Sequence, residues 1–149
     1  TRRISGLDRL TDVDVEQGLR RPDVVVHNAW FLIDIHNPAG GGQAERFSQP
    51  AKPYDIPYGA LVPRRMDGLL TAGRCISGSH RAHASYRVMG ISMAIGQAAG
   101  TAAALCARNG TSPRQLPYQL VQQALAKSGS VLFDGDTHQI NGGEQACAK

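Results

Sequence analysis

Cysteines and aromatic residues are scarce in this sequence of 149 residues. Aromatic side chains make up 5% of the chain, and its three cysteines, Cys75, Cys106 and Cys147, lie far apart without a C-x-x-C pair. An odd, widely spaced set of cysteines predicts neither a disulfide framework nor a zinc ribbon. It favours a reducing compartment, and we therefore expect a cytoplasmic protein.

Charge of one sign is not concentrated in any long segment. Charged residues make up 19% of the chain and the formal net charge is +4. Arginines are frequent near the N-terminal end, but no basic run with interleaved aromatic residues follows them. This pattern predicts no nucleic-acid partner. The hydrophobic content of 42% is that of an ordinary globular protein.

Long hydrophobic runs are also few. The stretch 91–107 is near the minimum length for a membrane span, and it contains Ser92, Gln97 and Thr101. Its many alanines and glycines give little transfer energy. We expect a buried helix of a globular protein and no membrane partner.

Residue types and turn signals predict several elements. Thr11 can cap a short helix over 11–19, and its early aspartates suit the positive end of a helix. β-Branched and aromatic residues predict one or two strands over 24–35. The stretch 68–73 is typical of a brief buried strand, followed by a polar loop with histidines and arginines. A long helix then ends at Asn109-Gly110, and another is expected over 117–128.

The long helix carries a face of very small residues. Ser92, Gly96, Gly100, Ala103 and Ala107 recur at spacings of three and four. Two glycines inside a helix cost roughly 1 kcal/mol each relative to alanine, so this face is expected to lie close to a sheet, another backbone or a flat ligand. Tight packing alone would also explain it. The N–H groups at the helix start attract negative charge, which favours a flat or anionic ligand there.

One long stretch resembles a known family. The run LLTAGRCISGSHRAHASYRVMGISMAIGQAAGTAAAL, preceded by YDIPYGALVP, resembles the C-terminal part of FAD-dependent oxidoreductases of the glutathione-reductase-like flavoprotein class. TRRISG, LTDVDVEQG and IDIH extend the resemblance to roughly residues 2–133. It implies an α/β fold, as a fragment of a two-domain, Rossmann-like FAD-binding flavoprotein. Residues 1–62 would end the substrate domain with its connecting strands, 63–133 would form the C-terminal part of the FAD-binding domain, and 134–149 a flexible tail.

The resemblance also implies the cofactor and the reaction. FAD would exchange a hydride with a small organic substrate. The loop after the strand would follow the pyrophosphate and ribityl chain, and the helix start would face the pyrimidine edge of the flavin. Reduced flavin is negative at that edge, which suits a helix N-terminus. The residues implied to bind the cofactor are Ala72, Gly73, Arg74, Ser77, Arg87, Val88, Met89, Gly90 and Ile91.

Histidines and an arginine are the candidate catalytic residues. In the fumarate reductases of this class an arginine and a histidine hold substrate carboxylates, and His80 and Arg87 are similar in type and placement. His83 joins them by position. His36 is a further candidate, because Asp34 and His36 alternate along the chain and can form an acid–base pair. No metal site is expected, since no carboxylate accompanies the histidines in their immediate stretch.

The sequence contains no G-x-G-x-x-G motif, which binds the adenosine half of FAD in this class. We therefore expect an incomplete enzyme whose partner is either a missing N-terminal part or a second copy of the chain. The alternative is a non-catalytic fragment, or an interaction module that packs through its Ala/Gly-rich helix.

Overall fold

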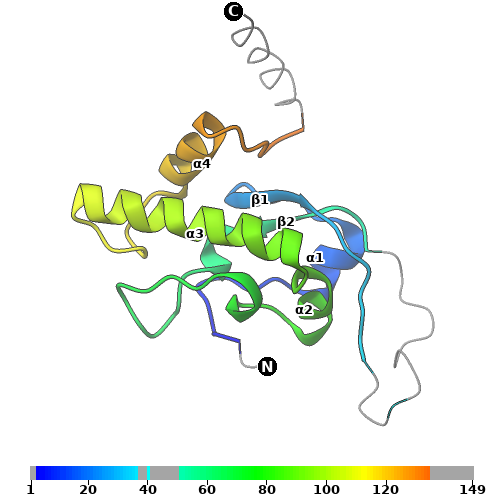
Figure 1. Cartoon of the computed structure of the whole chain (residues 1–149). Helices are drawn as coiled ribbons and strands as arrows, with labels where there is room; N and C mark the ends of the chain where they lie inside the picture. Colours follow the sequence, from blue (N-terminus) through cyan, green and yellow to red (C-terminus); the bar gives the residue numbers. More distant parts are fainter. Residues whose placement is uncertain (1–2, 37–39, 41–50, 135–149) are drawn as a thin grey trace, which may run out of the picture.

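The computed structural model describes residues 3–36, residue 40 and residues 51–134. Figure 1 shows the longest helix crossing a short strand pair, with short helices near its N-terminal end and the last helix above its middle. Within the described residues the elements are α1 (Asp12–Gln17), β1 (Val24–Ala29), β2 (Tyr54–Pro57), α2 (His80–Tyr86), α3 (Met89–Asn109) and α4 (Tyr118–Lys127), with 3-10 turns η1 (Tyr58–Ala60) and η2 (Gly73–Cys75).

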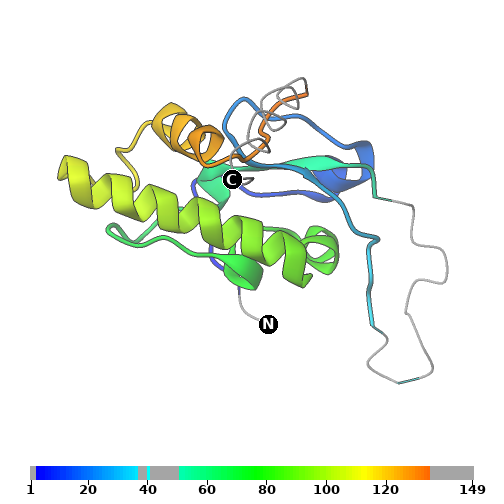
Figure 2. The same cartoon turned by 45° about the horizontal axis from the view of Figure 1, so that its top comes forward.

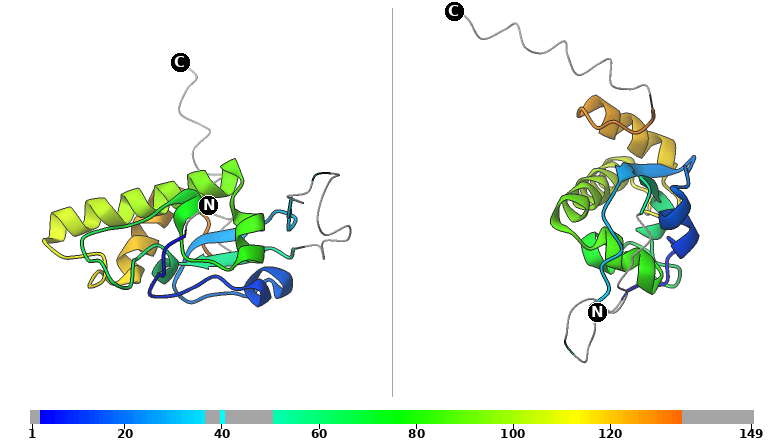
Figure 3. Two further views of the ribbon diagram at one scale, coloured as in Figure 1. Left: turned by 90° about the horizontal axis from the view of Figure 1, so that it is seen from below. Right: turned by 90° about the vertical axis from the view of Figure 1, so that its right-hand side faces the viewer.

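The two strands are antiparallel and form an irregular ladder. Val24 lies opposite Pro57, and Ala29 lies opposite Tyr54, with two register shifts between these pairs. Every residue of β2 is buried. The helix α3 packs against β1 on one side and α1 packs against β2 on the other, as the end-on view of Figure 3 shows. The small sheet is therefore covered by helices on both faces.

The buried carboxylate of Asp55 holds the strand pair to the chain before it. Asp55 is 2% exposed and accepts hydrogen bonds from Nη1 of Arg20 at 3.0 Å and the backbone N–H of Arg21 at 3.1 Å. Nδ1 of His27 lies 2.8 Å from the same carboxylate. A buried charge is tolerated only with such partners, so this cluster is structural.

Three of the predicted helices are confirmed, with caps of the expected kind. Thr11 and Asp14 form a reciprocal capping box at the start of α1. The helix α3 ends at Gly110, whose φ of 61° is left-handed and suits glycine. The helix α4 lies beside α3 and packs on it, as Figure 2 shows.

The prediction of a strand over 68–73 is wrong. Residues 68–72 form a coil, Gly73 begins η2, and the side chain of Leu69 is exposed. A strand needs a neighbour to satisfy its N–H groups, and the backbone N–H of Thr71 instead donates to the carbonyl of Leu61 at 2.9 Å. No other strand lies beside this stretch in the described part of the chain.

The polar loop expected before the long helix is mostly a helix. Ser79 caps α2 by accepting a hydrogen bond from the N–H of Ala82 at 3.1 Å, so the histidine and arginine segment winds into α2. The predicted strand over 24–35 is confirmed only for its first half, as β1.

The core buries the isoleucines of α3 and leaves both glycines of its small-residue face exposed. Ile91, Ile95 and Ala98 belong to the hydrophobic core, whereas Gly96 and Gly100 are exposed. A side chain added at either glycine would meet no atom within 4 Å. The expectation that this face packs closely against a sheet is therefore corrected for this chain. The isoleucine face is buried instead of the glycine face because burial stabilises in proportion to apolar area.

By length and composition, α3 would be able to cross a membrane, and 28% of its most apolar 18-residue stretch is buried. The core helix of a globular protein passes the same test, so this is weak evidence.

One hydrophobic core joins residues from both predicted segments, 1–62 and 63–133, and the division between them stays a prediction. The predicted tail lies, beyond residue 134, outside the described residues.

Candidate functional site

The four predicted catalytic residues lie together around one cavity. It has a volume of about 230 Å³, and its polar lining comes from α2, from the chain after β1 and from the N-terminal segment. We call this space the histidine cavity. It is lined by Arg3, Asp34, Ile35, His36, His80, His83, Ala84 and Arg87.

The helix α2 brings two histidines to the histidine cavity. His80 and His83 are three residues apart, so they share one face of the helix. The helix α2 is held in place by α1. The Ser79 hydroxyl donates to the Asp12 carboxylate, and the Arg81 guanidinium pairs with Glu16 at 2.9 Å. The segment predicted as a loop thus holds its histidines on a regular backbone.

His83 is buried and has an unused ring nitrogen. Its residue is 6% exposed, its ring stands edge-on to Tyr86, and its Nε2 has no hydrogen-bond partner among the described residues. Burial, and then the positive charges of Arg3, Arg74 and Arg87, lower the pKa of His83 to about 4. His83 is therefore neutral near pH 7, and its buried Nε2 keeps an unused hydrogen-bonding capacity in a residue that lines the cavity.

Asp34 fixes the orientation of two other candidates. Nη2 of Arg87 donates to the Asp34 carboxylate at 3.0 Å and to the Asp34 backbone oxygen at 2.8 Å. Nε2 of His36 lies 2.9 Å from the same carboxylate. The predicted contact between Asp34 and His36 is confirmed, and their role in acid–base chemistry stays a prediction.

The start of α3 lies next in sequence to Arg87 and is open. No side chain caps this helix at Val88, Met89 is 84% exposed, and a Cβ on Gly90 would meet no atom within 4 Å. The first N–H groups of a helix have no partner within the helix. Together with the helix dipole they attract a negatively charged group.

The turn η2 packs beside this helix start. A Cβ built on Gly73 would lie 3.7 Å from the side chain of Ser92, and Gly73 has a left-handed φ of 60°. The hydroxyl of Ser92 is buried and has no hydrogen-bond partner in the described chain. The sequence places Ser92 on the small-residue face of the helix, and only the structure shows that its hydroxyl lacks a partner among the described residues.

The predicted cofactor residues fall into two groups. Those around η2 and at the start of α3 lie at the surface or half-buried: Ala72, Gly73, Arg74, Arg87, Val88, Met89 and Gly90. Ser77 is 2% exposed and its N–H donates to the carbonyl of Ala60, and Ile91 belongs to the core. The first group presents side chains or open backbone at the surface around the start of α3.

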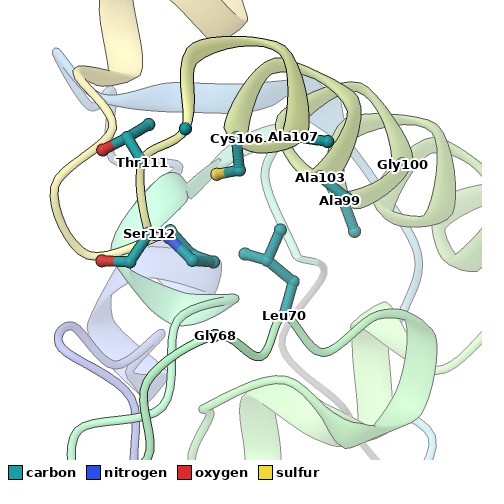
Figure 4. A pocket seen from close by; sticks show the side chains of 11 residues that line it. Gly68, Leu70, Ala99, Gly100, Ala103, Cys106, Ala107, Thr111 and Ser112 are labelled. Atoms are coloured by element: carbon teal, nitrogen blue, oxygen red, sulfur yellow. The ribbon is translucent and has the colours of Figure 1, made fainter.

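A second hollow runs along the small-residue face of α3. This apolar groove has a volume of about 630 Å³ and lies between α3 and the coil around Leu70, as Figure 4 shows. Gly100, Ala103 and Ala107 form its helical wall, and Leu70 points toward them from the other side. The face is small enough for a close approach and is covered by nothing in the described residues.

No group of three or more histidine, cysteine, aspartate or glutamate side chains gathers as metal ligands within the described ranges. The site offers the neutral buried imidazole of His83, the fixed guanidinium of Arg87 and the open backbone at the start of α3. Such groups suit a polar or anionic organic molecule.

Comparison with known proteins gives one match. Residues 1–125 match the model of a family described as FAD dependent oxidoreductase. The chain shows no significant match to curated proteins or to solved structures.

Proposed function

Because the chain belongs to the FAD-dependent oxidoreductase family, we propose that it supplies the flavin-side and substrate-side surfaces of an enzyme that transfers a hydride between FAD and a small organic substrate. FAD is the cofactor of this family. The observation that carries the proposal is the open N-terminus of α3, which follows directly in sequence on Arg87 of the histidine cavity.

The residues around the start of α3 fit a flavin. A flat ring needs open backbone, and Gly90 leaves open space where a side chain would otherwise stand. The buried hydroxyl of Ser92 lacks a partner that a polar ring edge can supply. Gly73 and Arg74 of η2 would lie along the rest of the cofactor, and the uncapped N–H groups of α3 would stabilise negative charge on the ring.

When bound, FAD supplies the two-electron chemistry of hydride transfer. The chain's own residues then bind and orient the substrate in the histidine cavity. Arg87, held by Asp34, offers a fixed positive charge, and Nε2 of neutral His83 offers one hydrogen bond. His80 and His36 line the same cavity and are the groups we propose to move a proton to or from the substrate.

The finer class assignment is part of the same proposal. The chain would contribute the C-terminal part of a glutathione-reductase-like, Rossmann-type FAD domain, since it lacks the G-x-G-x-x-G motif. The coil over 68–72 supports this view, because its sequence suits a strand that gains neighbours from another sheet. The partner would be an N-terminal part or a second copy of the chain.

The test is a titration of the purified chain with FAD, followed by flavin fluorescence and by gel filtration with visible absorbance. Arg74→Ala is compared with Arg108→Ala, which removes the same side chain at the far end of α3. We expect saturable binding that falls about tenfold or more in Arg74→Ala, as for the loss of one charge-assisted contact. Arg108→Ala should bind as the wild type does.

Equal FAD binding by the two variants would contradict the assigned position of the flavin. A chain that retains no flavin at any concentration would contradict the proposal that it presents a flavin surface by itself.

The exposed apolar face of α3 favours a second candidate, an interaction module. Gly96 and Gly100 are exposed on this face, and Met93 is 75% exposed. Analytical ultracentrifugation of the chain at several concentrations, with and without FAD, distinguishes the two functions. Association that depends on concentration and is unaffected by FAD would favour the interaction module, because apolar patches of this kind commonly mark interfaces.

A further inference from the structure

Three arginines line a second polar groove next to the histidine cavity. This groove has a volume of about 450 Å³, and we call it the arginine groove. Arg3, Arg9 and Arg64 supply its charge. The full lining is Arg3, Ile4, Ser5, Gly6, Arg9, Arg64, Ser77 and Gly78.

These three guanidinium groups have no hydrogen-bond or ion-pair partner within residues 3–36, 40 and 51–134. Other arginines differ: Arg20 pairs with Asp55, and Arg81 pairs with Glu16. No acidic side chain lines the arginine groove. Like charges gathered without a counter-charge repel one another, so their arrangement favours an anion between them.

The backbone beneath the arginine groove is fixed by pairing between distant segments. The N–H of Arg64 donates to the carbonyl of Ser5 at 2.9 Å, and the N–H of Ile4 donates to the carbonyl of Cys75 at 3.1 Å. Gly6 lies so close to its neighbours that an added Cβ would stand 2.8 Å from the Ser77 side chain. The arginines therefore extend from a rigid floor.

Arg3 lines both the arginine groove and the histidine cavity, so the two spaces adjoin. We propose that the arginine groove binds an anionic group of the substrate, a carboxylate or a phosphate, while the reacting part lies in the histidine cavity. The substrate class is then an anionic organic molecule. This assignment rests on the proposed function, because it takes the histidine cavity as the place of reaction.

Guanidinium groups suit this ligand. Each offers N–H donors in a planar fork that matches the oxygens of carboxylate and phosphate. Two or three such groups around one anion give charge-assisted hydrogen bonds, which are about twice as strong as neutral ones. A neutral substrate would leave the arginines without partners.

The test is a calorimetric titration of the 149-residue chain with succinate and, separately, with inorganic phosphate. The variant is Arg64→Gln, and the control is Arg65→Gln, an exposed arginine next in sequence that does not line the arginine groove. We expect saturable binding of at least one probe, weakened about tenfold by Arg64→Gln and unchanged by Arg65→Gln. Arg9→Gln repeats the test from a second position, and thermal unfolding checks that each variant is folded.

FAD binding is measured in the same samples to separate the two proposals. Anion binding that survives saturation with FAD supports a substrate subsite, and the probe that binds tells carboxylate from phosphate. Displacement of the probe by FAD would assign the arginine groove to the cofactor and overturn the inference. Equal weakening by Arg64→Gln and Arg65→Gln would also overturn it, with the proposed function intact. Anion binding by a chain that never binds FAD would refute the proposed function and the substrate assignment with it.

Discussion

Acidification should weaken the fold through His83. The pKa of this imidazole lies at about 4 in the folded chain, against an ordinary value of 6.5, because burial and nearby arginines disfavour its charged form. Between those two values the unfolded chain binds a proton that the folded chain does not. Stability is therefore complete above pH 6.5 and falls as the pH drops toward 4.

The magnitude follows from the two pKa values. Their difference corresponds to at most about 3 kcal/mol of free energy of unfolding. His83 borders the histidine cavity, and water in that cavity screens part of the effect, so we expect a loss of about 1–2 kcal/mol between pH 7 and pH 4.5.

Urea unfolding at a series of pH values measures this loss. His83→Gln removes the titrating group, and His80→Gln makes the same substitution three residues away on α2, at an exposed position. Subtracting the variant's pH profile from that of the wild type isolates the contribution of one histidine. We expect a flatter profile only for His83→Gln. Identical profiles for the wild type and His83→Gln would refute the reasoning.

The remaining predictions concern packing. Asp55→Ala should lower the free energy of unfolding by about 1–3 kcal/mol in chemical denaturation, because it removes the acceptor of the Arg21 N–H and of the buried His27 ring; an unchanged stability would contradict the structural role of that carboxylate. Gly100→Ala should raise stability by roughly 0.5–1 kcal/mol, since an added Cβ meets no atom within 4 Å and alanine favours the helix. Gly78→Ala should lower stability by about 1–3 kcal/mol, because its Cβ would stand 2.6 Å from the Tyr86 ring. Thermal melts compare the two glycine variants directly, and changes of the same sign in both would be inconsistent with these surroundings.

Local signals predicted the elements that depend on neighbours in sequence. Thr11 caps α1 and Gly110 ends α3 as expected, because a cap involves residues within one turn of each other. The resemblance of the run from Leu69 likewise indicated an FAD-dependent oxidoreductase, which the match over residues 1–125 bears out, whereas the glutathione-reductase-like class stays a proposal.

Elements that need a distant partner could not be predicted in the same way. The stretch 68–73 has the composition of a strand, but no strand of the described chain lies beside it, and it stays a coil. The segment from His80 forms a helix because Ser79 caps it. The Ser79 and Arg81 side chains also pair with Asp12 and Glu16, and the buried residues of the helix join the core. Pairing and docking of this kind arise from residues about 65 positions apart.

The sequence by itself determined the family, the cofactor and the small-residue character of α3. Only the tertiary structure decided that the four candidate residues, from His36 to Arg87, surround one cavity, and that Asp34 joins two of them. It also decided which face of α3 is buried, because the isoleucines offer more apolar area to the core than the glycines do. Composition is a property of each segment alone. The histidine cavity, and the buried Nε2 of His83 beside it, exist only because segments distant in sequence pack together.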